Sequence, residues 1–198
     1  MNFNNTKFIK SIGFYHDLSP SKKVEVAFCG RSNVGKSSLL NKLCNRKSLA
    51  KVGSTPGKTT TVNFFEVNDN VDLIDLPGYG YARRSEREKS RWAVLMEHYF
   101  NSERKIALTV LLLDIRHDPT ENDFQMINFL MYNNIPFIIV LTKRDKLSNT
   151  ASEERTEQFK QLLKPFRPVD ILQFSVFDDK SIIPIRNIII DTVGKIDD

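Results

Sequence analysis

The stretch Gly30-Arg31-Ser32-Asn33-Val34-Gly35-Lys36-Ser37 matches the pattern G-x-x-x-x-G-K-[ST], and the fold follows from it. In such a loop the glycines let backbone N–H groups turn inward around phosphates. Lys36 then supplies positive charge to the β- and γ-phosphates, and the Ser37 hydroxyl ligates Mg²⁺. The loop follows the apolar run 24–29 and precedes residues 37–44, whose leucines have helical spacing. We therefore expect a strand, a phosphate loop and a helix in succession, with the positive end of the helix dipole facing the anion.

Downstream of the loop, segments typical of strands alternate with segments typical of helices. The runs 61–67 and 71–76 are expected to form an antiparallel hairpin around 68–70. Alternation of this kind predicts an α/β fold with three layers (α/β/α) and a six-stranded, mostly parallel sheet that includes one antiparallel edge hairpin strand. Residues 24–196 are assigned to this single domain, and residues 1–23 to an N-terminal extension with room for one short strand. The remaining elements are expected as strands at 107–114, 136–141 and 169–174, and helices at 85–100, 120–132, 152–163 and 182–193.

Composition narrows the class of protein. The chain has 198 residues, of which 40% are hydrophobic and 27% charged, as in an ordinary globular domain. No run approaches the roughly 18 apolar residues of a membrane span, and residues 1–10 lack an apolar signal core, which predicts an unexported, cytoplasmic protein. The two cysteines, Cys29 and Cys44, are expected to be buried reduced thiols. The net charge of +5 and the sequence pI of about 9.2 favour anionic partners without choosing among RNA, DNA and lipid.

Two further segments indicate a guanine nucleotide as the ligand. Asp75 ends a predicted strand, where a carboxylate that holds the water ligands of Mg²⁺ belongs. Thr142-Lys143-Arg144-Asp145 follows the apolar strand 136–141. A carboxylate there can accept hydrogen bonds from N1–H and the exocyclic amine of guanine, whereas adenine would leave it unpaired, and such sites can discriminate by about 10⁴ or more. The stem of Lys143 can lie along the base, and a further base contact is expected near Ser175.

The motifs together resemble a known family. They are, in order, the phosphate loop, Thr55-Pro56-Gly57-Lys58-Thr59, Asp75-Leu76-Pro77-Gly78-Tyr79-Gly80-Tyr81, Thr142–Asp145 and Phe174-Ser175. This set is similar to the EngB-type (YihA/YsxC-type) GTPases of the TrmE–Era–EngA group, and the resemblance spans about residues 5 to 195. It implies the fold of a P-loop NTPase G domain. It also implies a bacterial enzyme that hydrolyses GTP to GDP and phosphate, assists assembly of the large (50S) ribosomal subunit and has a link to cell division and septation.

Carried over by position, the resemblance implies a full set of site residues. Ser37 and Thr59 would ligate Mg²⁺, and Lys36, Thr59, Gly78 and Asn33 would contribute to catalysis. Sequence chemistry alone does not choose Thr59 over the neighbouring Thr60 and Thr61. Val176 stands where a small residue is usual, so only its backbone could contact the base. The nucleotide contacts would come from Gly30, Arg31, Ser32, Asn33, Val34, Gly35, Lys36, Ser37, Gly57, Lys58, Thr59, Thr60, Thr61, Asp75, Leu76, Pro77, Gly78, Thr142, Lys143, Arg144, Asp145, Phe174, Ser175 and Val176.

The sequence leaves more than one route of GTP hydrolysis open. Many GTPases place a Gln after D-x-x-G to orient the attacking water, but Tyr79 stands there, so we expect its ring to pack away and intrinsic turnover to be slow. Asn33 could hold a K⁺ ion where an arginine finger would otherwise act, as in relatives of the wider group, or it could merely shape the loop. A partner could also supply groups in trans. His98 and His117 are interpreted as surface or packing residues rather than as a general base.

Two basic segments predict the partner. Residues 46–61 are a candidate switch loop, and residues 78–91 carry cations interleaved with aromatic residues, a composition suited to RNA. The partners expected are therefore GTP or GDP, rRNA and the large ribosomal subunit, with the protein itself a monomer. The absence of a lipidation motif argues against a membrane partner. Three alternatives stay open: a solvated basic surface, a regulatory GTPase acting on a protein unrelated to ribosomes, and a nucleotide sensor that does not hydrolyse. The cations of the second segment are Arg83, Arg84, Arg87, Lys89 and Arg91.

Overall fold

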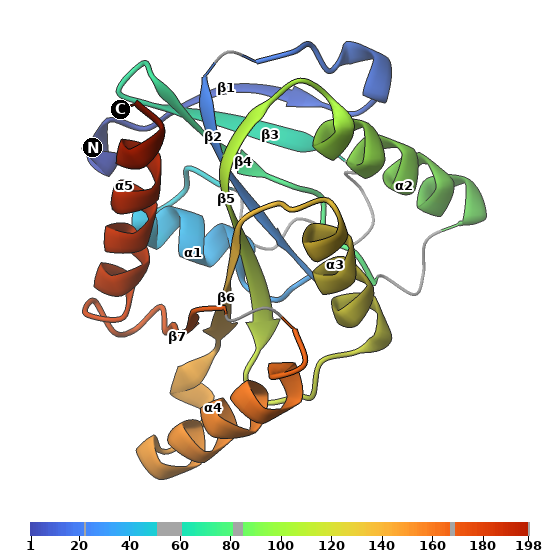
Figure 1. The fold of residues 1–198 in the computed structure, drawn as a ribbon. Helices are drawn as coiled ribbons and strands as arrows, with labels where there is room; N and C mark the ends of the chain where they lie inside the picture. Colours follow the sequence, from blue (N-terminus) through green and yellow to red (C-terminus); the bar gives the residue numbers. More distant parts are fainter. Residues whose placement is uncertain (22, 51–60, 81–84, 167–168, 198) are drawn as a thin grey trace.

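The computed structural model of the chain shows a single sheet with helices on both faces (Figure 1). The structure describes residues 1–21, 23–50, 61–80, 85–166 and 169–197. The strands are β1 (Lys7–Ile12), β2 (Val24–Gly30), β3 (Val62–Val67), β4 (Val71–Asp75), β5 (Lys105–Asp114), β6 (Phe137–Thr142) and β7 (Ile171–Gln173). The α-helices are α1 (Lys36–Leu43), α2 (Glu86–Asn101), α3 (Glu121–Tyr132), α4 (Asn149–Leu163) and α5 (Ile182–Asp197). The short 3₁₀ helices are η1 (Phe3–Asn5), η2 (Tyr15–Asp17) and η3 (Arg144–Lys146).

The sheet has the strand order β1-β3-β4-β2-β5-β6-β7. β2 pairs in parallel with β4 on one side and with β5 on the other, and β6 and β7 continue the parallel arrangement. β3 is antiparallel to both of its neighbours. The expected α/β class, layers and mostly parallel sheet are confirmed. The hairpin is confirmed as well, and its turn uses Asn68 (φ 51°) and Asp69 (φ 63°), residue types that tolerate the left-handed region.

The number of strands differs from the prediction: the described part of the sheet has seven strands, not six. The additional strand is β1, which pairs with β3 and takes the edge position expected for the hairpin. Five of its six residues are exposed, so its sequence lacks the apolar run or alternation that marks a covered strand.

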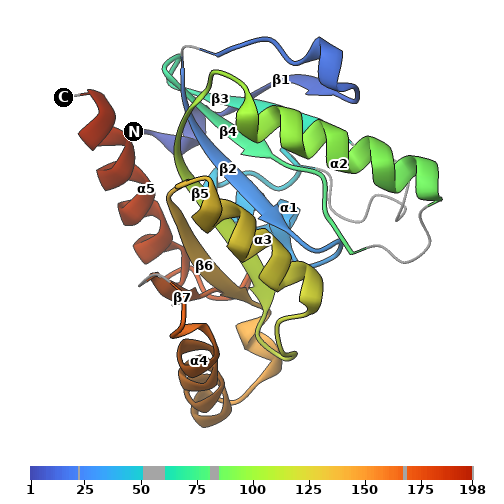
Figure 2. The same ribbon diagram turned by 45° about the vertical axis from the view of Figure 1, so that its right-hand side comes forward.

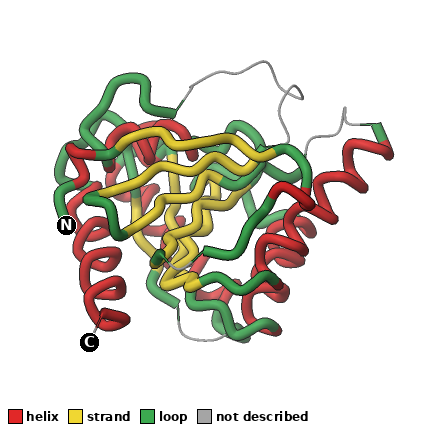
Figure 3. Tube along the Cα trace, turned by 90° about the horizontal axis from the view of Figure 1, so that it is seen from above, coloured by secondary structure: helices red, strands yellow, loops and turns green. Residues whose placement is uncertain are grey.

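Two apolar cores lie on the two faces of the sheet. The view from above shows helices on both sides of the strands (Figure 3). α1 and α5 cover one face, and α2, α3 and α4 cover the other. β5 carries a run of seven buried residues because both of its faces are covered, as expected for an inner parallel strand. Both cysteines are buried free thiols, as predicted. Among the described residues, no helix is both long and apolar enough to span a bilayer.

Candidate nucleotide-binding site

The phosphate loop connects the end of β2 to the start of α1. Gly35 has φ 112° and precedes α1 without a side-chain cap, and the first turn of the helix holds no acidic residue. The first N–H groups of α1 are therefore directed at a potential anion. Gly30 lacks a side chain for a steric reason, because a Cβ there would lie 2.8 Å from the carbonyl oxygen of Leu112 and 2.9 Å from Cγ1 of Val34.

Lys36 and Asp75 face each other at the carboxyl ends of β2 and β4. The Nζ atom of Lys36 lies 3.7 Å from Oδ1 of Asp75. This Oδ1 is buried, and no described group hydrogen-bonds to it, while Asn63 donates to Oδ2 over 3.4 Å. A buried carboxylate oxygen in this state fits a role in holding a water ligand of Mg²⁺. Ser37, half-buried in the first turn of α1, places a hydroxyl at the same end of the strands.

The segment after β4 is joined to the phosphate loop through the backbone. Leu76 N–H donates to the Phe28 carbonyl (3.0 Å), and Ser32 N–H donates to the Tyr79 carbonyl (3.0 Å). A Cβ at Gly78 would lie 2.9 Å from the backbone nitrogen of Ser32, so only glycine fits this approach. The backbone of residues 75–78 is thereby held against the loop, and the phosphate contacts of Asp75, Leu76, Pro77 and Gly78 stay a prediction.

Tyr79 occupies the position after D-x-x-G at which many GTPases carry a water-orienting glutamine. Its ring is buried, and its hydroxyl donates a hydrogen bond of 2.8 Å to Oδ1 of Asp123 at the start of α3. Burial, together with the charge of Asp123, raises the pKa of Tyr79 well above its usual range, so the phenol stays neutral. Trp92 packs edge-on against the ring and donates from Nε1 to the Pro77 carbonyl (2.9 Å). The side chain thus points away from the phosphate loop.

Residues Thr142–Asp145, which are expected to contact the base, begin where β6 ends; we call them the base-recognition segment. Lys143 has φ 60°, and its Nζ lies 3.0 Å from Oδ2 of Asp114 at the end of β5. Burial opposes the ionisation of Asp114, but hydrogen bonds from Arg116 and Lys143 outweigh it and hold the pKa of this carboxyl well below its usual range. Asp114 therefore stays charged and fixes the lysine stem beside the expected position of the base.

Asp145 meets the segment that follows β7. The Ser175 hydroxyl donates to Oδ1 of Asp145 over 3.1 Å, and Nζ of Lys146 lies 3.5 Å from Oδ2. Arg144 N–H donates to the Phe174 carbonyl (3.2 Å), which holds the two segments together. The structure thus brings Ser175, for which a contact with the base was predicted, next to Asp145.

The phosphate loop and the base-recognition segment are in direct contact. The Thr142 hydroxyl donates to the Val34 carbonyl (2.6 Å) and lies 3.1 Å from the Leu113 carbonyl. A hollow of about 230 Å³ lies beside the phosphate loop, and Asn33, Asp114 and Lys143 are among its lining residues. The described members of the expected site therefore lie along the carboxyl ends of the strands, the general position of ligand sites in open α/β sheets.

Part of the expected site lies outside the described residues. Gly57, Lys58, Thr59 and Thr60 belong to the segment 51–60, and Arg83 and Arg84 belong to 81–84. Thr61 is described and begins the approach to β3, and its hydroxyl donates to Asn63 (3.2 Å).

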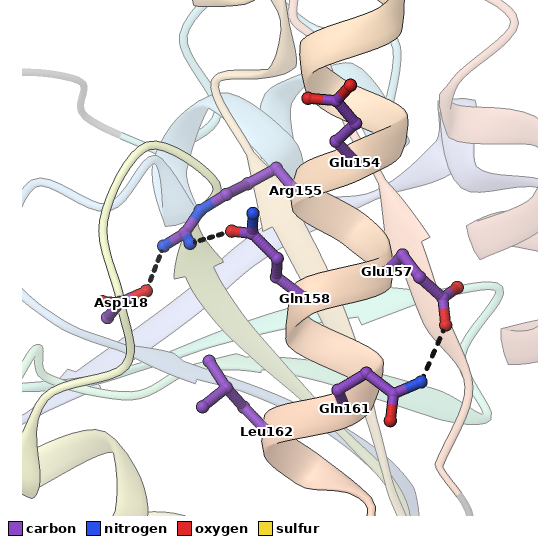
Figure 4. Close-up of a pocket in the computed structure, with 7 residues that line it drawn as sticks. All are labelled: Asp118, Glu154, Arg155, Glu157, Gln158, Gln161 and Leu162. Carbon is purple, nitrogen blue, oxygen red and sulfur yellow. Dashed lines mark hydrogen bonds and ion pairs between the residues drawn. The ribbon is translucent and has the colours of Figure 1, made fainter.

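A second hollow, on the outer face of α4, holds none of the expected nucleotide contacts (Figure 4). There Arg155 donates to Asp118 (2.5 Å) and Gln158 (2.6 Å), and Gln161 donates to Glu157 (3.0 Å). These side chains satisfy one another at the surface.

Sequence reasoning missed several residues that support the site. Asp123 accepts from Tyr79 and, through Oδ2, from the backbone N–H and the hydroxyl of Thr120 at the start of α3. Asp114 and Asn63 support Lys143 and Asp75. The spacing T-x-x-D at Thr120–Asp123 marks a helix start, so it signalled the capping role of Asp123 but not its contact with Tyr79.

Comparisons with known proteins agree with this geometry. A family model described as 50S ribosome-binding GTPase matches residues 25–143. A probable GTP-binding protein EngB from Exiguobacterium sp. is 45% identical over 170 residues, which cover 86% of this chain and 86% of the relative. Its counterpart from Syntrophomonas wolfei is 54% identical over 142 residues, 70% of this chain and 74% of the relative. A crystal structure of a probable GTP-binding protein EngB matches with a TM-score of 0.70 at 26% identity, covering 86% of this chain and 99% of that one.

The fold, the phosphate loop and the family match define a P-loop GTPase, an enzyme that binds and hydrolyses GTP. Within that class, the similarity over most of the chain is specific to one group. The chain belongs to the EngB family of GTP-binding proteins.

Replacement of Asp145 by Asn is expected to lower GTP affinity by about 100-fold or more. The amide can accept only one of the two guanine hydrogen bonds, and its own N–H group opposes the other donor. Xanthosine triphosphate, which carries a carbonyl in place of the exocyclic amine, should bind Asp145→Asn better than GTP does. Equilibrium titration with fluorescent nucleotides measures both affinities. Asp191→Asn, an exposed aspartate of α5, is the matched control. GTP affinity within twofold of the unaltered protein would disprove the assignment.

Tyr79→Phe tests the buried hydrogen bond to Asp123. The substitution leaves Oδ1 of a buried carboxylate without its donor, so the free energy of unfolding should fall by about 1–3 kcal/mol. Tyr132→Phe is the control, because Tyr132 is 87% exposed and its hydroxyl reaches water; its change should stay within about 0.5 kcal/mol. Urea unfolding measures both values. Equal midpoints for the two variants would show that the contact contributes nothing.

Proposed function

We propose that the chain is a GTP-dependent switch that assists assembly of the large ribosomal subunit. The observation that supports this most is the match of a 50S ribosome-binding GTPase model to residues 25–143, a range that runs from β2 to Lys143. The match therefore includes the phosphate loop and the first two residues of the base-recognition segment, Thr142 and Lys143. We also propose the division into an N-terminal extension, residues 1–23, and one G domain, residues 24–196, acting as a monomer in the cytoplasm. The link to cell division and septation stays a prediction.

Mg²⁺ fits the residues at the phosphate end of the site. Ser37 and Thr59 would be its protein ligands, and the buried Oδ1 of Asp75 would hold one of its waters. When bound, the ion supplies positive charge to the β- and γ-phosphates. Lys36 adds its own charge from the first residue of α1, where the helix dipole acts in the same direction. The 3.7 Å separation from Asp75 keeps the lysine head at the phosphate end without a close ion pair.

Hydrolysis in this site would depend on positioning and charge rather than on a general base. Gly78 lies beside the loop backbone, where its N–H could meet the γ-phosphate. Tyr79 is turned toward Asp123 and offers no group to orient the attacking water. These two features support slow intrinsic turnover and a need for groups from a partner or an ion.

RNA in the ribosomal particle is the proposed partner of the basic segment after Gly78. In the described part of this segment, Arg87, Lys89 and Arg91 are exposed on α2, and Lys89 pairs with Glu86 (2.6 Å). The segment begins directly after residues that would sense the γ-phosphate, so nucleotide state could alter RNA affinity.

Co-sedimentation with large ribosomal subunits and their precursors tests the proposed function. We expect the full-length protein to pellet with the particles in a non-hydrolysable GTP analogue and to be released in GDP. Asp145→Asn, which should not load GTP, is the control that should stay in the supernatant with both nucleotides. A protein that never pellets, yet hydrolyses GTP, would instead be a regulatory GTPase for another partner.

A K⁺ requirement is the proposal for Asn33. The residue has φ 63°, a conformation that asparagine tolerates, and its side chain is exposed at the hollow beside the loop. We expect GTP hydrolysis to be about tenfold faster in KCl than in NaCl, equivalent to about 1.4 kcal/mol in the barrier. Asn33→Gly keeps the backbone conformation and removes the amide oxygen, so it should abolish the difference between the salts. Phosphate release measures the rates, and equal rates of the unaltered protein in both salts would leave Asn33 with a loop-shaping role alone.

A further inference from the structure

An exposed cluster of aromatic and basic side chains lies where η2 meets α2. Phe14 and Tyr15 are 49% and 47% exposed, although both rings contact other side chains. His16 and the α2 residues Arg91 and His98 complete the cluster, and all three are exposed as well. We call these five residues the stacking platform. None of them belongs to the nucleotide-binding site.

The planar groups of the stacking platform are already arranged against one another. The Arg91 guanidinium carbon lies 5.4 Å from the centroid of the Phe14 ring. The Phe14 and His16 rings are stacked, with centroids 5.5 Å apart and an interplanar angle of 15°. Tyr15 meets His98 edge-on at 5.4 Å, which ties the N-terminal segment to α2. Because these contacts limit side-chain rotation, little conformational entropy would be lost when a further flat group is added.

Positive charge continues from the platform along α2. Arg87, Arg91, Val94 and His98 are separated by four, three and four positions, so they share one face of the helix. All four are exposed. Arg91 and His98 contact Phe14 and Tyr15, so this face of α2 is the one beside η2. Figures 1 and 2 show the N-terminal segment, in blue, running next to α2. The guanidinium of Arg91 in the platform is therefore followed along the same exposed face by that of Arg87, one turn nearer the start of α2.

We propose that the stacking platform binds unpaired bases of single-stranded RNA, while Arg87 and Arg91 contact its phosphates. Exposed aromatic and guanidinium planes accept any base by stacking, and adjacent cations fit the backbone that joins successive bases. The net charge of +5 complements the same ligand. The surface is less suited to a protein partner, because it consists of flat rings and cations around one small aliphatic side chain, Val94. This proposal rests on the proposed function, since it names the surface that would hold the RNA of the ribosomal particle.

The test measures the affinity of the full-length protein for a short fluorescent oligoadenylate by anisotropy. Phe14→Leu and Tyr15→Leu keep apolar volume at the η2–α2 contact and remove the aromatic faces. Each should weaken binding by about 5- to 100-fold, the loss expected when a base loses its stacking partner. Affinity for a duplex RNA of the same length should not change, because its bases are already stacked.

The cations are tested by salt dependence. Arg91→Gln should weaken binding to the single strand and reduce the slope of log affinity against log salt by about 0.7, the value for one lost phosphate contact. Lys160→Gln, on the exposed surface of α4, removes one charge far from the platform and should leave the slope unchanged. The matched control for the aromatic variants is Tyr132→Leu, which removes an 87% exposed ring from α3.

Several outcomes would overturn the proposal. In the first, the unaltered protein has no measurable affinity for oligoadenylate. In the second, Phe14→Leu and Tyr15→Leu bind oligoadenylate normally. In the third, Tyr132→Leu loses as much affinity for oligoadenylate as the two platform variants do. Fluorescent GTP binding establishes that each variant is folded, and Arg91→Gln carries the test if an aromatic variant does not fold.

Co-sedimentation with large subunits separates this proposal from the proposed function. Aromatic variants that lose particle binding but keep normal affinity for oligoadenylate would show that the surface contacts a protein, which contradicts the proposal. An unaltered protein that binds no particles, together with variants that lose oligoadenylate, would refute the ribosomal role while supporting the platform. Particle binding that survives in variants with normal RNA affinity would refute the platform alone.

Discussion

The parallel pairing of β2 with β4 on one side and β5 on the other determines where every part of the site lies. Parallel strands end at the same edge of a sheet, so the phosphate loop after β2, Asp75 at the end of β4 and Asp114 at the end of β5 meet there. β6 pairs with β5 and brings the base-recognition segment to the same edge. The close approach of Gly30 to the Leu112 carbonyl requires a residue without a side chain at the point where the loop begins.

Within this frame the phosphate loop is the centre of a hydrogen-bond network. Its Val34 carbonyl accepts from Thr142 of the base-recognition segment, and its Ser32 N–H donates to the Tyr79 carbonyl of the segment after β4. The segment expected to recognise the base and the segment expected to sense the phosphate are therefore both joined to the same loop. A shift of the loop would change contacts on both sides, because each contact is short and at least partly shielded from water.

The sequence predicted the parts of the site that motifs carry, and it missed those that depend on tertiary contacts. The phosphate loop and Asp145 were identifiable because nucleotide chemistry restricts the residue types at fixed spacing. β1 was not, because an exposed edge strand needs no apolar pattern. Asp114 and Asp123 act through partners distant in sequence, Lys143 and Tyr79, and no local spacing reports such pairs. α4 begins at Asn149 rather than at 152, since Ser148 caps it by accepting from Ala151 N–H, a helix start that could have been predicted from Ser148 itself.

α2 connects the segment after β4, which contains Pro77, to the stacking platform. Trp92 on this helix donates to the carbonyl of Pro77, the residue directly before the basic segment 78–91. Its neighbour toward the N-terminus, Arg91, lies over Phe14. A helix moves largely as a rigid body, so a displacement of Pro77 that keeps the Trp92 hydrogen bond would carry Arg91 with it. The hydrogen bond from Tyr79 to Asp123 opposes such a displacement, because it ties the same segment to α3. The segment after β4 is therefore anchored twice, by Trp92 on the helix that carries Arg91 and by Asp123 at the start of α3.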